Sequence, residues 1–276
     1  GESMKLSASI VLYKTDPKIL ELAIATFLGH TNDANRTLYL VDNSPTDQLR
    51  TIVDTDSRIV YISNPSNPGF GAAHNLALSL AIQSKNDYHF VINPDVSAKD
   101  DVVQTIVAYM EENKDVGMCM PRILNSDGSP QYLPKLLPSP YSIVMRKLKH
   151  PKKLYHQFID SYELRKVESG KIYEAPVLSG CFTVFRVSAL AEIGVYDDRF
   201  FMYFEDWDIS RRMNRCYKTV YFPKASIFHD YESGANHNRR LLKIFIKSAI
   251  YYFNKWGWFF DKERKRINDL TLSQFK

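Results

Sequence analysis

Short apolar runs alternate with helical patterns along the N-terminal part of the chain. We predict strands at residues 7–13, 37–41, 59–62 and 88–92, because these runs are rich in Val, Ile, Leu and aromatic side chains. Asp16 can cap a helix that has Pro17 at its first position, and a second helical pattern covers residues 72–83. This alternation is typical of an α/β fold with a mainly parallel sheet flanked by helices.

The pattern weakens after residue 125. Residues 125–173 are rich in Pro, Lys and Tyr and have little periodicity, so we predict an irregular insertion that could border an acceptor site. Regular patterns return with a strand at 179–186, a helix at 205–215 and a strand at 219–229.

The C-terminal region predicts a basic amphipathic helix that begins near Arg239. Arg240, Lys243 and Lys247 recur at helical spacing, and apolar side chains occupy another face. Such a helix can lie on an anionic membrane surface. The alternative is a helix packed on the rest of the protein with a solvated basic side.

The composition limits the possible domain organisation. The 276 residues are 45% hydrophobic and carry a net charge of +5, which suits one large domain with a small helical appendage. We therefore expect a vector-derived remnant at 1–3, a main domain at 4–236 and a basic amphipathic helical region at 237–276. Three separated cysteines argue against a disulfide framework or a zinc site, and no signal peptide pattern is evident. A cytoplasmic location is the expectation.

Polar residues follow several predicted strands, and ligands of open α/β sheets gather at the carboxyl ends of strands. Asp42 ends one apolar strand, where its carboxylate could accept a hydrogen bond from a nucleobase or a ribose. A loop-capping Asp would give the same pattern.

A glycine-containing loop follows the third predicted strand. Asn67, Gly69 and Gly71 precede a helix that contains Asn75, so the loop offers backbone amides and a helix N-terminus to an anion. The glycine spacing is not that of a dinucleotide-binding fingerprint, which disfavours an NAD enzyme. A simple turn that starts a helix remains the alternative.

Two positions suggest a divalent metal. Asn93 and Asp95 follow a buried strand, and oxygen ligands at a strand end suit Mg²⁺ or Mn²⁺ that bridges a diphosphate. His229, at the end of a later apolar strand, could be a second metal or diphosphate ligand. A turn and a structural histidine are the alternatives.

Three carboxylates lie within four residues at the start of the predicted helix 205–215, directly after an aromatic run. Glu205 or Asp206 could abstract a proton from an acceptor hydroxyl, and Arg211 or Arg212 could face a phosphate. The helix dipole, which favours anions in the first turn, offers a simpler explanation.

The order of these motifs resembles family 2 glycosyltransferases of the GT-A fold, and it is most similar to bacterial rhamnosyltransferases of surface polysaccharide synthesis. The resemblance runs from about Leu6 to about Ser233 and includes Gly180 in a Ser-Gly-Cys sequence. Its most specific element is the block from Asp197 to Asp208.

The resemblance implies roles for these residues. Asp42 would hold the base of the nucleotide, Asp95 would bind the metal, and His229 would bind the metal or the diphosphate. Glu205 and Asp206 fill the family's Glu-Asp motif, which supplies the general base; Asp206 is slightly favoured. The remaining residues assigned to the donor site are Asn67, Gly69, Asn75, Asn93, Gly180, Arg211 and Arg212.

The implied reaction is an inverting, metal-dependent transfer of a sugar to a polyprenyl-diphosphate-linked glycan in O-antigen, capsule or cell-wall synthesis. The expected donor is dTDP-L-rhamnose, and another hexose from a UDP-sugar is the alternative. A nucleotidyltransferase and a non-catalytic nucleotide- or glycan-binding module are less favoured. A nucleic-acid partner is not expected, because the basic residues form one terminal helix instead of a groove with interleaved aromatics. The protein would lie peripherally on the inner face of the bacterial cytoplasmic membrane.

Overall fold

The structure is a computed structural model that describes residues 3–230 and 238–276. The helices are α1 (Pro17–Leu28), η1 (Arg50–Thr55, a 3-10 helix), α2 (Phe70–Gln83), α3 (Val102–Glu112), α4 (Pro140–Leu148), α5 (Lys152–Tyr162), α6 (Val187–Ile193), α7 (Glu205–Asn214), α8 (Arg239–Trp256) and α9 (Lys262–Ser273). The strands are β1 (Leu6–Leu12), β2 (Arg36–Asp42), β3 (Ile59–Ser63), β4 (Tyr88–Ile92), β5 (Val96–Ser97), β6 (Val116–Leu124), β7 (Tyr173–Glu174), β8 (Phe182–Arg186) and β9 (Lys218–His229).

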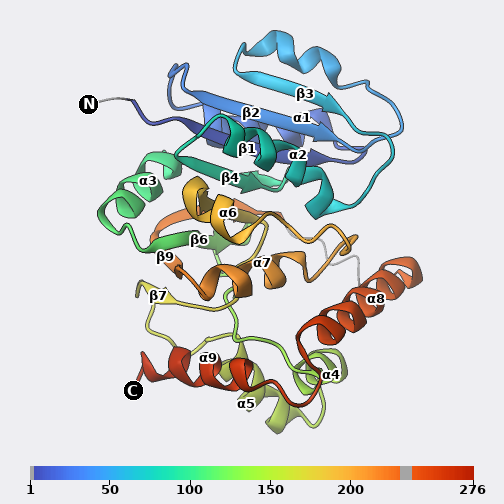
Figure 1. Ribbon diagram of the computed structural model, residues 1–276, viewed down its shortest axis with the longest axis vertical. Helices are drawn as coiled ribbons and strands as arrows, with labels where there is room; N and C mark the ends of the chain where they lie inside the picture. The colour runs from blue at the N-terminus through green and yellow to red at the C-terminus, as the bar shows by residue number, and fades with distance from the viewer. Residues whose placement is uncertain (1–2, 231–237) are drawn as a thin grey trace.

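One sheet runs through the molecule (Figure 1) in the order β3-β2-β1-β4-β8-β6-β9-β5, and β7 pairs with β9. The four N-terminal strands of this order are parallel, as is the pair β6 and β9. β8 runs antiparallel to both β4 and β6. Helices cover the faces of the sheet, so the predicted α/β architecture is confirmed. The carboxyl ends of β1, β2 and β4 meet at one edge, where ligands are expected.

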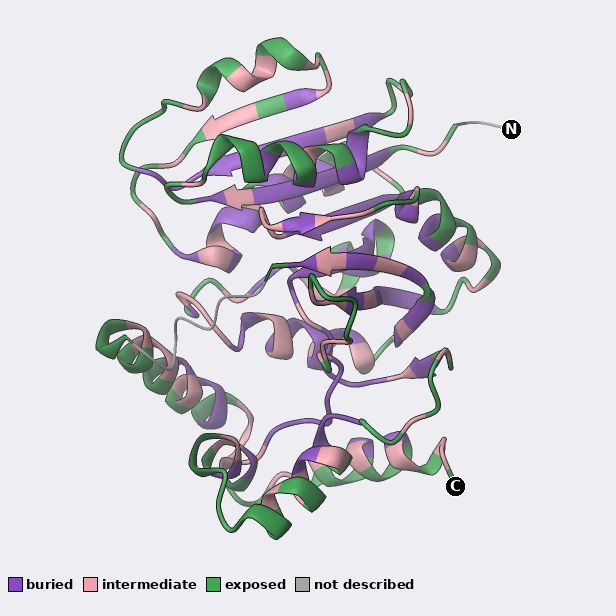
Figure 2. Ribbon diagram, turned by 180° about the vertical axis from the view of Figure 1, so that it is seen from behind, coloured by how far each residue is buried: buried purple, intermediate pink, exposed green. Residues whose placement is uncertain are grey.

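The N-terminal elements form where the sequence predicts them. Asp16 caps α1 by accepting a hydrogen bond of 2.9 Å from the Lys18 amide, and Pro17 occupies the first helical turn. Leu20, Ala23 and Phe27 bury one side of this helix. All five residues of β4 are buried, which explains its continuous apolar run. Figure 2 shows this burial concentrated in the strands.

The expectation of an irregular insertion at 125–173 is wrong, because this segment contains α4 and α5. Ser139 and Ser142 form a capping box at the start of α4, and Pro140 is its first residue. The predicted strand at 179–186 begins only at Phe182, since residues 179–181 form a loop.

Helices α8 and α9 follow the sheet and pack on the rest of the protein. Tyr252 and Phe253 of α8 contact Phe200 and Phe204 in a separate apolar cluster. α9 buries Ile267 in another small cluster. The expected boundary between residues 236 and 237 lies outside the described residues. Within the described ranges, every helix is too short or too polar to cross a bilayer.

Candidate active site

A cleft of about 960 Å³ lies between the strand ends and the helices of the inserted segment. Asn93, Gly180, Asp206 and His229 line it on the side of the sheet. The other wall comes largely from α4, α5 and α8, which gather at one end of the molecule (Figure 1). The structure therefore brings several predicted site residues from distant parts of the chain into one cavity.

Helix α7 begins at Glu205 and places the two candidate bases differently. Asp206 is partly exposed in the cleft; its Oδ2 accepts a hydrogen bond of 3.1 Å from the Gly180 amide, and its Oδ1 accepts one from Trp207. Glu205 is 5% exposed, and its buried Oε2 has no hydrogen-bond partner among the described residues. Both carboxylates line the cleft, but Asp206 is the one that hydrogen bonds from two backbone amides hold in place.

The electrostatic environment reinforces this distinction. Burial, and next the neighbouring Asp206, raise the pKa of Glu205 well above its ordinary value. Burial also raises the pKa of Asp206, but the Gly180 amide and the buried Lys135 oppose that shift. A base must be ionised to accept a proton, so Asp206 is better suited to that role than Glu205.

The chain enters α7 through an uncommon backbone conformation. Tyr203 and Phe204 have φ angles of 68° and 69°, in the left-handed region that aromatic residues seldom adopt. Phe204 is nearly fully buried against Trp207, Phe245 and Tyr252, so aromatic packing holds this turn. Strain of this kind is typical of functional sites.

The two predicted metal ligands lie together. Nε2 of His229 is 3.1 Å from Oδ1 of Asp95, and β5 and β9 pair at this point. Gln131 fixes the imidazole, because it lies 3.2 Å from Nδ1 and donates a hydrogen bond of 2.9 Å to the His229 carbonyl oxygen. An orienting partner on the second ring nitrogen is usual for a metal-binding histidine.

The side chains at this position fit Mg²⁺ or Mn²⁺. Oδ1 of Asn93 is buried without a hydrogen bond in the described part of the chain, and Asn93 lines the same cleft as His229. No group of three or more His, Cys, Asp or Glu side chains within the described ranges is arranged to hold a metal. A site with few protein ligands suits these ions, which commonly retain water and bind substrate phosphates.

The glycine loop has a structural reason for one of its glycines. Gly69 has φ of 111°, and a Cβ atom there would lie 2.4 Å from the carbonyl oxygen of Phe201. The neighbouring Phe70 amide donates a hydrogen bond to the same oxygen. Asn67, in a left-handed turn with φ of 48°, precedes it. The loop is thus joined to the segment that leads into α7.

Asp42 lies at the end of β2 and is 1% exposed. Its Oδ2 accepts a hydrogen bond of 2.5 Å from the Tyr61 hydroxyl, and its Oδ1 accepts one of 3.0 Å from the Ser44 amide. The second contact is the loop-capping arrangement that the sequence left as an alternative. Both carboxylate oxygens are therefore engaged within the protein.

Two residues assigned to the donor have structural partners instead. The side-chain amide of Asn75 donates a hydrogen bond to the Tyr196 carbonyl oxygen and accepts one from the Tyr196 backbone amide. Arg211 is 1% exposed and pairs with Asp261 and Glu263. The prediction that Arg211 faces a phosphate is wrong, because its guanidinium links α7 to the C-terminal helices.

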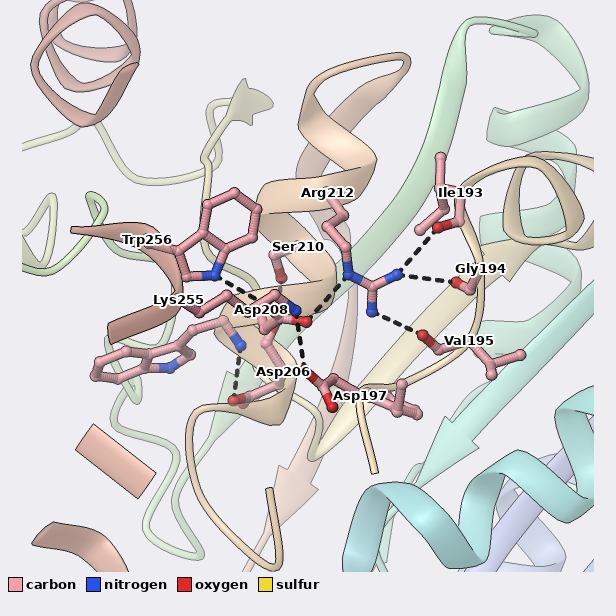
Figure 3. A network of polar contacts seen from close by, with 12 residues as sticks. Ile193, Gly194, Val195, Asp197, Asp206, Asp208, Ser210, Arg212, Lys255 and Trp256 are labelled. Atoms are coloured by element: carbon pink, nitrogen blue, oxygen red, sulfur yellow. Dashed lines mark hydrogen bonds and ion pairs between the residues drawn. The ribbon is translucent and has the colours of Figure 1, made fainter. Parts of the chain in front are cut away.

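Arg212 has a similar structural role, which Figure 3 shows. Its guanidinium pairs with the buried Asp208 at 3.0 Å and donates hydrogen bonds to the carbonyl oxygens of Ile193, Gly194 and Val195. Asp208 also pairs with Lys255 and accepts a hydrogen bond from the Trp256 indole. This network stabilises the helix that carries Asp206.

Two residues of the site were missed by sequence reasoning. Lys135 is buried, and burial lowers its pKa to about 8, while Glu163 and Asp206 favour its charged form. Gln131, described above, orients His229. Both lie in the segment expected to be irregular. No local pattern marks either one, because the carboxylates that act on Lys135 and the imidazole that contacts Gln131 lie far away in the sequence.

The family comparison decides the class of protein. The profile of "Glycosyl transferase family 2" matches residues 7–194, which is more than half of the chain. The chain belongs to this family of glycosyltransferases. The matched segment contains the loops after β2, β3 and β4 and also Gly180, whereas α7 and His229 follow it.

Known relatives are identical to this glycosyltransferase at about a quarter of the aligned positions. An N-acetylglucosaminyl-diphospho-decaprenol L-rhamnosyltransferase of Mycobacterium tuberculosis is 26% identical over 202 residues, which cover 69% of this chain and 65% of the relative. The rhamnosyltransferase WbbL of Escherichia coli K12 is 23% identical over 236 residues, or 81% of this chain and 84% of WbbL. The chain thus spans slightly less than two thirds of the mycobacterial relative.

Solved structures confirm the GT-A fold. GalNAc-T7 with UDP, GalNAc and Mn²⁺ has a TM-score of 0.63 at 15% identity, and the match covers 90% of this chain and 48% of that one. The mannosyltransferase PcManGT of Pyrobaculum calidifontis, in complex with GDP-Man and Mn²⁺, has a TM-score of 0.57 at 13% identity. That match covers 91% of this chain and 63% of the mannosyltransferase.

Proposed function

We propose that this glycosyltransferase moves a sugar from a nucleotide diphosphate donor to a hydroxyl group of a lipid-linked glycan, with inversion at the anomeric carbon. The observation that carries the proposal is the shared cleft of Asp206 and His229, with Asp95 in contact with the imidazole. A base and a diphosphate site on one cavity are what a direct displacement requires.

The residues divide the work between proton transfer and diphosphate binding. Asp206 accepts the proton of the acceptor hydroxyl as that oxygen attacks the anomeric carbon and the bond to the nucleotide diphosphate breaks. Asp95, His229 and Asn93 would hold Mg²⁺ or Mn²⁺, which would neutralise negative charge on the departing diphosphate. The Gly180 amide keeps the Asp206 carboxylate oriented. Glu205 lies at the start of α7, where burial raises its pKa and favours the protonated form.

We further propose L-rhamnose from dTDP-L-rhamnose as the transferred sugar and a polyprenyl-diphosphate-linked glycan as the acceptor. The support is the similarity to two rhamnosyltransferases, one of which is named for a diphospho-decaprenol acceptor. Transfer of another hexose from a UDP-sugar is the second candidate, supported by the hexosyltransferase Agl10 of Haloferax volcanii, which is 25% identical over 217 residues. That match covers 76% of this chain and 62% of Agl10.

A peripheral position on the anionic inner face of the cytoplasmic membrane completes the proposal. Leu242, Ile246 and Ile250 of α8 lie four residues apart and are 41–48% exposed, so they form one apolar stripe on the surface. Lys243 and Lys247 lie on the same helix. Apolar side chains flanked by lysines are typical of helices that bind anionic bilayers.

The test of the donor is a panel of sugar nucleotides measured by thermal shift and hydrolysis. dTDP-rhamnose, UDP-glucose, UDP-galactose and GDP-mannose are each compared with free nucleoside triphosphates, in Mg²⁺, in Mn²⁺ and in EDTA. Binding to the folded state raises the melting temperature, so micromolar affinity is detectable. A metal-dependent shift with dTDP-rhamnose alone is expected. A shift with a UDP-sugar instead would support the second candidate. The absence of any thermal shift or hydrolysis with every nucleotide tested would contradict the proposed activity.

A further inference from the structure

Four cations line the cleft. Arg146, Lys147 and Lys149 lie at the C-terminal end of α4, and Arg165 follows α5. The only carboxylate that α4, α5 and the loop after α5 contribute to the lining is Glu163. This wall of the active-site cleft is therefore strongly positive.

Two of these cations are held by a buried carboxylate. Glu163 is 7% exposed; it accepts hydrogen bonds of 2.6 and 2.8 Å from Arg165 and lies 3.9 Å from Arg146. Arg165 also lies over the Tyr132 ring, 4.4 Å from its centroid. The arginines thus have a fixed position, which a binding site requires and a solvated surface does not.

The other two cations, Lys147 and Lys149, lie with Arg146 at the C-terminal end of α4. Burial lowers the pKa of Lys147, and the neighbouring Arg146 and Lys149 lower it further. Lys149 ends α4 in a left-handed conformation with φ of 57°, which is uncommon for a lysine. A bound anion would favour the charged form of Lys147, because a nearby opposite charge stabilises an ammonium group.

Apolar side chains accompany the cluster, both in the cleft and on the surface of α4. Ile143, Tyr155 and Phe245 line the cavity beside the cations. Beyond them, Tyr141, Val144 and Leu148 give α4 an exposed apolar stripe. Lys147 of α4 lies 4.3 Å from the Phe245 ring of α8, so the two helices are neighbours. A cationic pocket thus opens beside two apolar helix surfaces.

We propose that Arg146, Lys147, Lys149 and Arg165 form a second anion site in the cleft, which binds the diphosphate of the lipid-linked acceptor while its isoprenoid chain leaves along α4 and α8. The inference rests on the proposed function, because it assumes that the acceptor hydroxyl is presented to Asp206 in the same cavity. In this arrangement the cleft holds two diphosphate groups. The diphosphate of the donor lies near Asp95 and His229, and the diphosphate of the acceptor lies near α4. Charge-assisted hydrogen bonds from guanidinium and ammonium groups are well suited to phosphate oxygens.

The test measures binding of farnesyl diphosphate, a short polyprenyl diphosphate, by calorimetry in the full chain. We expect the double variant Lys147→Gln/Lys149→Gln to bind it roughly tenfold more weakly or worse, because it loses two charge-assisted contacts. Lys152→Gln/Lys153→Gln is the matched control; it makes the same charge change on exposed residues of α5 that do not line the cleft. Equal binding by both variants would overturn the proposal.

Two further binding measurements test whether the cluster binds the donor nucleotide or a lipid headgroup instead of the acceptor diphosphate. Metal-dependent binding of dTDP and UDP is expected to be unchanged in the Lys147→Gln/Lys149→Gln variant, and an equal loss there would assign the cluster to the donor instead. Binding to anionic vesicles without farnesyl diphosphate tests a lipid headgroup role; loss of vesicle binding with unchanged farnesyl diphosphate affinity would overturn the acceptor site. If the proposed function itself is wrong, the wild-type protein will bind no nucleotide in any arm, which is a different result.

Discussion

The guanidinium of Arg211 lies over the Trp256 ring, with its central carbon 4.3 Å from the ring centroid. This contact joins α7, which carries Asp206, to the last turn of α8. Arg211 also pairs with Asp261 at 2.8 Å and with Glu263 at 3.0 Å. The helix that holds the proposed catalytic carboxylate is thus fixed to the helices that follow the sheet.

Loss of this connection is expected to destabilise the protein. Arg211→Met leaves Asp261, which is 4% exposed, without its buried partner, so the free energy of unfolding should fall by about 3–5 kcal/mol. Arg215→Ala is the control, because Arg215 is half exposed and pairs with the same Glu263. Arg215→Ala should lower the free energy of unfolding by less than about 1 kcal/mol. Urea denaturation measures both, and equal losses would contradict the structural role of Arg211.

The metal assignment predicts a loss of metal dependence. Asp95→Asn should remove most of the Mn²⁺-dependent thermal shift with a nucleoside diphosphate, because a neutral amide is a weaker ligand than a carboxylate. Gln131→Leu should weaken apparent Mn²⁺ affinity by about 10–100-fold, since it removes the group that orients His229. If both variants keep the wild-type metal dependence, Asp95 and His229 are not the metal site.

The buried Lys135 predicts a change in the pH profile of transfer. Its positive charge lowers the pKa of Asp206, so Lys135→Met should raise that pKa. The base then requires a higher pH to ionise, and the acid limb of kcat/KM should move upward. Because the pKa of Lys135 is about 8, the difference should be present below that pH. Superimposable profiles would show that Lys135 does not act on the base.

The buried Glu205 predicts how stability depends on pH. Its pKa is raised in the folded protein above the unfolded value of about 4.3, so the folded state holds the proton more tightly. Wild-type stability should therefore fall as pH rises above that value, whereas Glu205→Gln lacks this loss. The advantage of the variant should therefore grow as pH rises above the unfolded value. A difference in stability between the variant and the wild type that stays constant with pH would contradict the assignment.

The sequence predicts the first strands well because each is a continuous apolar run that is buried in the sheet. The start of α7 was also predicted correctly, since its carboxylates follow an aromatic run that packs against α8. Helix α4 was missed although Ser139 and Pro140 mark its start, because the segment's weak periodicity hid it. Capping residues were a better guide there than hydrophobic spacing.

The predicted roles of the arginines failed for a different reason. Arg211 finds its partners about fifty residues later, at Asp261 and Glu263, and no local pattern reveals such contacts. The same holds for Lys135 and Gln131, whose functions depend on α7 and β9. Local signals thus pointed to the carboxylates and the histidine that the structure places on one cleft, whereas the residues that contact them required the three-dimensional structure.

The most direct test of the catalytic assignment is transfer from the sugar nucleotide identified in the donor panel, measured for Asp206→Asn beside Glu205→Gln. Asp206→Asn keeps a similar shape but cannot accept the proton, so transfer should fall by at least about 100-fold while metal-dependent donor binding is retained. Glu205→Gln should keep most of its turnover. Undiminished transfer by Asp206→Asn would contradict the account.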